Sequence, residues 1–160
     1  MFSRLRAGLV ASAVLALSAL PVSASEVILT IDGEIAGGAP VDMTREDLEA
    51  LGSATIVTRT PWSESAVTFE GVPFKALLDR VGATGDTLAV VALNNYRSEL
   101  PLADIEHYGV ILALKQDGAY MPVSDKGPLF IVYPFDSDAA LDNEVYYARS
   151  AWQVRSITVE

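Results

Sequence analysis

Apolar residues recur in short runs along the chain from residue 26 onwards, and glycine, proline and asparagine separate these runs. Short stretches in which apolar and polar residues alternate are typical of strands, and the separating residues are typical of turns. The pattern predicts strands over residues 26–31, 54–60, 66–70, 87–93, 96–100, 110–114, 120–123, 129–133 and 152–159. The pair Asn94-Asn95 predicts a tight hairpin between the fourth and fifth of these strands.

Helix signals cover three stretches, which are residues 44–52, 73–82 and 101–109. In the first, Thr44 and Asp47 have the spacing of a capping box, in which each side chain caps the backbone N–H of the other residue. In the second, Pro73 precedes apolar residues at helical spacing, and Gly82 follows them. Strands outnumber these short helices and do not alternate regularly with long ones. The expected fold is therefore α+β, a compact domain with a mixed or antiparallel β-sheet.

The first 24 residues have the pattern of a processing segment. Arg4 and Arg6 precede an apolar run over residues 7–20, and small residues follow it. This order is typical of a general secretory signal, and the run is shorter than the roughly 20 residues that cross a bilayer. We expect cleavage between Ala24 and Ser25, which leaves residues 25–160 as a single exported domain. The expected location is periplasmic or secreted, with no stable membrane insertion after cleavage.

The composition argues against several classes of function. The chain has 160 residues, 21 acidic and 11 basic side chains, a formal net charge of −10, one histidine and no cysteine. Disulfides, thiolate-bound metals, cysteine nucleophiles and histidine-rich metal sites are therefore excluded. We expect no nucleic acid partner, because binding of phosphate backbones depends on clustered basic residues. Loss of a leader with two arginines and no acid changes the net charge to −12.

Two polar features resemble active or metal sites but fit ordinary structural roles better. His107 lies in the last turn of a predicted helix, where a cation is common, and no G-x-S-x-G motif accompanies it. Four acids crowd one stretch and could bind a hard cation, namely Asp136, Asp138, Asp142 and Glu144. Their spacing lacks the register of a calcium loop, which favours a solvated acidic loop. Nothing selects a carboxylate pair for glycoside hydrolysis, and we assign no catalytic or metal-binding residue.

Basic and aromatic residues gather at the predicted ends of strands. Six of them are candidates for ligand binding: Arg59, Trp62, Tyr96, Arg97, Lys126 and Arg149. Arginine offers paired donors and lysine a point charge, so several of these residues together could bind a small anion. In the alternative interpretation the aromatic rings fill the core, while Arg97 and Arg149 pair with some of the many acids. The sequence leaves both interpretations open.

One segment resembles a known family. Residues 67–78, Val-Thr-Phe-Glu-Gly-Val-Pro-Phe-Lys-Ala-Leu-Leu, are similar to the W-x-G-V-P-L-x-x-L-L segment of the sulfite-oxidase-type oxidoreductase molybdopterin-binding domain. Further segments follow the order of that domain, and these are residues 29–33, 43–48, 95–97, 100–102, 111–113, 117–122, 126–128, 133–134 and 152–154. The resemblance covers nearly all of residues 25–160. It implies the mixed α+β fold of the family and a site for a molybdopterin cofactor.

The resemblance fails at the residue expected to bind the metal. In the family, a cysteine between the early strand and the G-V-P segment binds molybdenum, whereas residues 55–62 have Thr58, Arg59 and Thr60 where it is expected. Threonine hydroxyls are hard donors with a high pKa and replace a soft thiolate poorly. The leader reads Arg4-Leu5-Arg6, without the adjacent arginines used to export folded, cofactor-loaded members. We therefore expect no molybdenum cofactor.

Three functions are consistent with these observations. The leading hypothesis is an exported, non-catalytic relative of the family that binds a small anionic ligand or a periplasmic protein partner in the former cofactor cleft. The alternative is a molybdopterin-dependent oxidoreductase, or a subunit of one, that binds the cofactor without cysteine ligation. The third is a structural accessory protein without a ligand.

Overall fold

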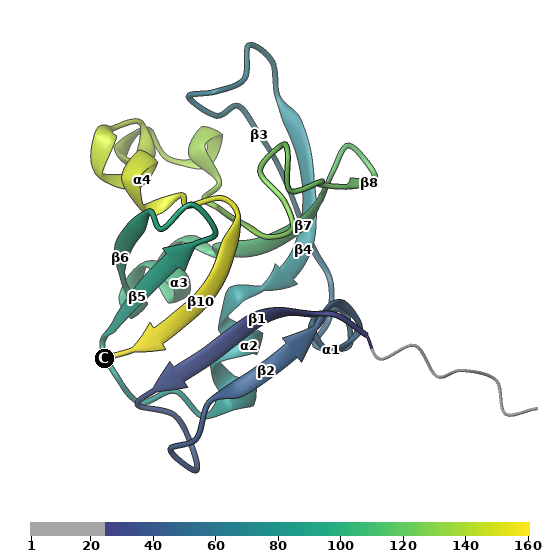
Figure 1. The fold of residues 1–160 in the computed structure, drawn as a ribbon. Helices are drawn as coiled ribbons and strands as arrows, with labels where there is room; N and C mark the ends of the chain where they lie inside the picture. The colour runs from purple at the N-terminus through teal and green to yellow at the C-terminus, as the bar shows by residue number, and fades with distance from the viewer. Residues whose placement is uncertain (1–24) are drawn as a thin grey trace, which may run out of the picture.

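The computed structural model describes residues 25–160, and the predicted signal peptide over residues 1–24 lies outside this range. Ten strands in the described range form two sheets, and short helices lie beside them (Figure 1). No helix within residues 25–160 has both the length and the apolar character needed to cross a membrane. The combination of sheets with a few short helices confirms the predicted α+β class.

The first sheet has the strand order β2-β1-β10-β5-β6. Its strands are β1 (Val27–Gly33), β2 (Val41–Thr44), β5 (Thr87–Ala92), β6 (Arg97–Pro101) and β10 (Val154–Val159). β1 and β10 pair in parallel and the other neighbours are antiparallel, so the sheet is mixed. β5 and β6 form the predicted hairpin. Asn95 in its turn has a φ of 65°, which asparagine tolerates better than most residues.

The second sheet has the order β3-β4-β7-β8, and β9 also pairs with β7. Its strands are β3 (Ala54–Thr58), β4 (Val67–Pro73), β7 (Ile111–Gln116), β8 (Ala119–Tyr120) and β9 (Phe130–Val132). β8 is shorter than the strand predicted over residues 120–123. An isolated bridge joins Phe130 of β9 to Trp152, which lies just before β10, so the two sheets meet at this point.

Four α-helices lie within residues 25–160, and these are α1 (Arg45–Glu49), α2 (Phe74–Val81), α3 (Leu102–Tyr108) and α4 (Glu144–Arg149). Short 3₁₀ turns precede α4, at residues 135–137 and 139–141. Thr44 and Asp47 form the predicted capping box of α1, with the Thr44 backbone N–H donating to the Asp47 carboxylate at 2.9 Å. Gly82 ends α2 in the left-handed conformation. The first three helices are thus confirmed.

The structure corrects the prediction at three elements, β2, α4 and β4. The sequence pattern predicts neither β2 nor α4, and α4 lies at the end of the stretch interpreted as an acidic loop. Its N-cap is Asn143, whose side chain accepts a hydrogen bond from the Val145 N–H. β4 runs to Pro73, whereas the predicted strand ends at residue 70. A Cβ at Gly71 would lie 2.1 Å from the Leu112 carbonyl oxygen, so this glycine permits a close approach of β4 and β7 rather than a turn.

Two apolar clusters form the core. The larger one joins the first sheet to α2 and α3, which lie behind it in Figure 1, and includes the buried side chains of Leu77 and Ile105. The smaller one lies on the second sheet around Phe69 and Phe130. Trp152 packs against this smaller cluster. The second cluster therefore provides a rigid base for the residues around Trp152.

Candidate ligand-binding cleft

The loop between β3 and β4 places Trp62 against the smaller core cluster. The centroid of its ring lies 5.0 Å from that of Trp152 and 6.0 Å from that of Phe130, and both pairs are edge-to-face. Tyr147 of α4 approaches the same indole at 6.3 Å. Edge-to-face pairs at these separations are mutually attractive. Trp62 is still 39% exposed, so one side of this aromatic group faces solvent.

A hollow of about 300 Å³, which we call the aromatic cleft, lies beside Trp62. Its lining consists of Trp62, Asn94, Tyr96, Tyr147, Ala148, Ser150, Ala151 and Trp152. The Tyr96 hydroxyl donates to the Ala148 carbonyl oxygen at 2.9 Å, and the Ser98 hydroxyl donates to the same oxygen at 2.7 Å. These bonds hold the β5–β6 hairpin against α4. The cleft is therefore assembled from the β3–β4 loop, the β5–β6 turn and α4, which are far apart in the sequence.

Two further hollows adjoin the aromatic cleft. One, of about 460 Å³, includes Arg59 and shares Tyr147 with the cleft. The other, of about 430 Å³, includes Arg97 and Arg149 and shares Tyr96 with the cleft. The structure thus brings five of the six predicted candidates together around α4, namely Arg59, Trp62, Tyr96, Arg97 and Arg149.

Arg59 is paired within the protein. Its Nη2 lies 2.9 Å from Asp136 Oδ1, and its backbone N–H donates to Asp136 Oδ2 at 2.8 Å. The backbone and side-chain donors of Arg59 lower the pKa of Asp136, and the hydrogen bond to Asp136 raises the pKa of Arg59. The pair is largely exposed to water, so it contributes little to stability. An anionic ligand would compete with Asp136 for this guanidinium.

Arg149 is also paired, and its partner is less accessible. Its Nη1 donates to Asp104 Oδ2 at 2.7 Å, and the Tyr133 hydroxyl donates to the same oxygen at 2.9 Å. The side chains of Arg149 and Asp104 are 22% and 12% exposed. Burial raises the pKa of Tyr133, and the nearby Asp104 charge raises it further. Arg149 therefore ties α4 to α3, as the alternative interpretation of the sequence expects.

The two remaining cations differ in position. Arg97 is exposed at the start of β6, and none of the four ion pairs within residues 25–160 includes it. Lys126 bonds to Asp125 at 3.1 Å and lines none of the three hollows around α4. Arg97 is therefore the predicted cation best placed to meet an anion at the rim of the aromatic cleft.

The aromatic cleft has lining residues that are not among the sequence candidates, including Tyr147, Ser150 and Trp152. A signal for them is present, because they lie close to Arg149 in the sequence and two of them are aromatic. The sequence candidates are mainly charged residues, and these three neighbours carry no charge. Only the packing of α4 against Trp62 brings their side chains to the same hollow.

The acidic stretch and the lone histidine make local contacts. Asp138 accepts a hydrogen bond from the Ala140 N–H, Asp142 accepts one from the Tyr147 hydroxyl, and Asp136 bonds Arg59. His107 is exposed at the end of α3. Within residues 25–160, no three His, Asp or Glu side chains are grouped so that they could hold a metal ion.

The comparisons with known proteins agree with the fold. A family model described as the oxidoreductase molybdopterin binding domain matches residues 18–137. This chain belongs to that family. The crystal structure of the sulfane dehydrogenase SoxCD from Paracoccus pantotrophus is similar, with a TM-score of 0.63 and 19% identity, over 88% of this chain and 39% of that one. At this identity the likeness concerns the fold alone, and the chain spans less than half of that structure. No curated protein matches it.

The residues near the expected metal ligand do not fit the molybdenum of this molybdopterin-binding family. Thr58 is fully buried, and its hydroxyl donates to the Arg59 carbonyl at 3.1 Å and accepts from the Asp136 N–H at 2.9 Å. The Thr60 hydroxyl is 3.1 Å from the Ser63 hydroxyl and bonds to it. Both oxygens are hard donors that already bond within the protein, whereas molybdenum in this family takes a soft thiolate. Neither threonine replaces the missing cysteine.

Proposed function

We propose that this chain is an exported, non-catalytic binding module of the molybdopterin-binding family, and that its aromatic cleft binds a small ligand with an apolar body and an anionic group. The observation that carries the proposal is the role of Thr58. Within residues 58–60, where the family resemblance implies a metal ligand, Thr58 has a buried hydroxyl that joins two backbone segments. A nearby hollow nevertheless stays open to solvent beside Trp62. Loss of the metal donor with retention of an open cleft supports binding as the function.

The lining of the aromatic cleft favours a ligand with an apolar body. The rings of Trp62 and Trp152 offer wide apolar surfaces, and each Å² of apolar surface removed from water contributes about 25 cal/mol. Two polar side chains of the lining already bond within the protein. Asn94 accepts a hydrogen bond from the Tyr96 N–H at 3.0 Å, and Ser150 donates to the Tyr146 carbonyl at 2.9 Å. The ligand therefore gains most from apolar contact and stacking.

The anionic group of the ligand is assigned to Arg97. Arg97 lies at the hollow that shares Tyr96 with the aromatic cleft, and no acid within the described range pairs with it. The surplus of acids over the whole chain repels anions, so a local unpaired guanidinium is needed to select one. A cleft of this volume has the size of a small-molecule site, which favours a small ligand over a segment of a periplasmic protein.

The cofactor content of the natively expressed protein tests the first half of the proposal. Protein purified from its native compartment would be measured for molybdenum by mass spectrometry and for pterin fluorescence after acid release. We expect neither at a stoichiometric level. Stoichiometric molybdenum or pterin would overturn the binding-module proposal and favour the molybdopterin-dependent oxidoreductase that binds the cofactor without cysteine.

Calorimetric titration tests the second half, with benzoate, indole-3-acetate and acetate as probes. The aromatic acids are expected to bind more tightly than acetate, and Arg97→Ala is expected to weaken them by about tenfold, the loss of one charge-assisted contact. Arg80→Ala, at an exposed arginine of α2, is the matched control and should leave binding unchanged. Absence of binding by every probe would overturn the proposal and favour an accessory protein without a ligand.

A further inference from the structure

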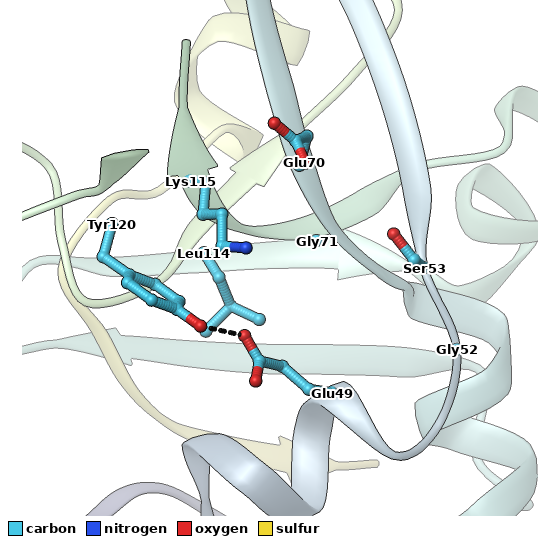
Figure 2. Close-up of a pocket in the computed structure, with 8 residues that line it drawn as sticks. All are labelled: Glu49, Gly52, Ser53, Glu70, Gly71, Leu114, Lys115 and Tyr120. Carbon is cyan, nitrogen blue, oxygen red and sulfur yellow. Dashed lines mark hydrogen bonds between the residues drawn. The ribbon is translucent and has the colours of Figure 1, made fainter. Parts of the chain in front are cut away.

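A separate hollow of about 240 Å³ lies on the second sheet, between α1 and β8 (Figure 2). It is lined by Glu49, Gly52, Ser53, Glu70, Gly71, Leu114, Lys115 and Tyr120. None of these residues lines the three hollows around α4. Figure 2 shows the long side chains of four different elements, α1, β4, β7 and β8, around its opening. The hollow is therefore a second candidate site, independent of the aromatic cleft.

Two opposite charges at this hollow remain unpaired. Glu70 of β4 and Lys115 of β7 are direct partners in the strand register, so their side chains lie on the same face of the sheet. Both residues are half-buried. The four ion pairs within residues 25–160 nevertheless involve other side chains. A carboxylate and an ammonium group thus face one hollow, and neither belongs to an ion pair within the described range.

Tyr120 contacts three charged side chains at or near the hollow, which are those of Glu49, Arg45 and Lys115. Its hydroxyl donates to Glu49 Oε1 at 2.5 Å, and this hydrogen bond raises the pKa of Tyr120. The guanidinium carbon of Arg45 lies 4.4 Å from the centre of the Tyr120 ring, and Lys115 Nζ lies 4.8 Å from it. Both distances are typical of cation–π contacts, which place the two cations on the ring. Arg45 Nε is buried and has no hydrogen-bond partner.

The hollow therefore presents charges of both signs. Glu49, Glu70 and Lys115 line it, and Arg45 lies against the ring of Tyr120, which also lines it. A simple anion would be attracted by the bases and repelled by the acids, and a simple cation would meet the reverse. A molecule with both charges can satisfy both sets at once. Three suitable metal-binding side chains are not grouped anywhere in the described range, so a metal ion is the poorer occupant.

We propose that this hollow binds a small zwitterion of the α-amino acid class. The carboxylate of the ligand accepts hydrogen bonds from Lys115, and its ammonium group donates to Glu70. Ser53, at the opening, offers a hydroxyl as a further partner. The volume corresponds to several water molecules of about 30 Å³ each, which suits an amino acid with a short side chain. The side chain of Leu114 contributes apolar lining beside the charges.

A ligand titration of the exported protein, followed by the backbone amide shifts in ¹H–¹⁵N correlation NMR spectra, tests this proposal. The probes are L-alanine and L-serine, with propionate and ethylammonium as single-charge controls of similar size. We expect saturable shifts for the amides of Ser53, Glu70, Gly71, Lys115 and Tyr120 with the amino acids, and binding at least about tenfold weaker for either control. Equal binding of propionate or ethylammonium, or no saturable shift with either amino acid, would overturn the proposal.

Matched variants separate ligand contacts from folding. Glu70→Gln and Lys115→Met are each expected to weaken L-alanine at least about tenfold while the spectrum keeps the dispersion of a folded protein. Glu99→Gln and Lys75→Met make the same changes at exposed sites on β6 and α2 and should bind as the parent does. Unchanged binding of L-alanine by both Glu70→Gln and Lys115→Met would contradict the proposal. A negative result in these experiments does not count against ligand binding in the aromatic cleft, because the two sites share no lining residue.

Discussion

The hydroxyl of Thr58 accepts a hydrogen bond from the backbone N–H of Asp136, a residue 78 positions later in the chain, over 2.9 Å. Asp136 in turn accepts from both the backbone and the side chain of Arg59. The end of β3 and the 3₁₀ turn at residues 135–137 are therefore joined as one unit. This unit includes Thr58 and Arg59, which lie in the stretch where the family resemblance implies a metal ligand. The Thr58 hydroxyl therefore has a structural role in this chain.

Replacing Thr58 tests this structural role. Thr58→Val keeps the shape of the side chain but leaves the buried Asp136 N–H without its acceptor, so we expect a loss of about 1–3 kcal/mol in the free energy of unfolding. Urea denaturation measures the change. Thr55→Val, at an exposed threonine on the same strand, should change the free energy by less than about 0.5 kcal/mol. Equal effects of the two variants would contradict the assigned role.

Tryptophan fluorescence should report directly on the aromatic cleft. The chain has two tryptophans, and both Trp62 and Trp152 line the cleft. A ligand that stacks there is expected to change the emission, and Trp62→Ala should weaken binding by about tenfold because a large aromatic contact is lost. Val57→Ala removes an exposed apolar side chain of β3 and serves as the control. A ligand that binds without any change in emission would place its site elsewhere.

The pair between Arg149 and Asp104 should stabilise the fold rather than bind the ligand. Arg149→Ala leaves a poorly exposed carboxylate with only the Tyr133 hydroxyl as donor, so we expect a loss of about 2 kcal/mol in stability, reduced from the value for a fully buried pair. Adding Asp104→Asn should recover part of this loss, because the unpaired charge is then removed. Thermal and urea denaturation of both variants measure the effect. Unchanged stability combined with abolished ligand binding would make Arg149 a ligand contact instead.

Alkaline pH should loosen the contact between α3 and α4. The hydrogen bond with Tyr146 raises the pKa of Tyr108 to about 12, above the ordinary value of 10.0. A group whose pKa is raised by folding stabilises the protein fully below its unfolded value and loses that contribution as pH rises through the folded value. We therefore expect stability to fall between about pH 10 and pH 12.

Tyr108→Phe provides the comparison for the alkaline transition. The variant lacks the ionisable hydroxyl, so its stability should fall less steeply over the same pH range than that of the parent. Denaturation midpoints at pH 9 and at higher pH would be compared between the two proteins. Identical pH dependence would show that the hydroxyl of Tyr108 makes no contribution.

Local signals predicted most elements correctly. Thr44 and Asp47 form their capping box within one turn of helix, and Gly82 ends α2 through its own backbone conformation, so neighbouring residues are enough to predict both. β4 and α4 show where this fails. The local pattern predicts a strand that ends at residue 70, whereas Gly71 continues β4 and lets it approach the Leu112 backbone of β7. That role depends on a strand far along the chain, which no local pattern includes.

The sequence by itself determined the family resemblance, the α+β class and the absence of a thiolate, because these follow from residue types and their order. Only the tertiary structure decided which basic residues have partners. Arg59 and Arg149 bond Asp136 and Asp104, whereas Arg97 has no ion pair within the described range. These pairs join residues 77 and 45 positions apart. An ion pair requires contact within a few Å, and such contact between remote residues is set by how the strands and helices pack.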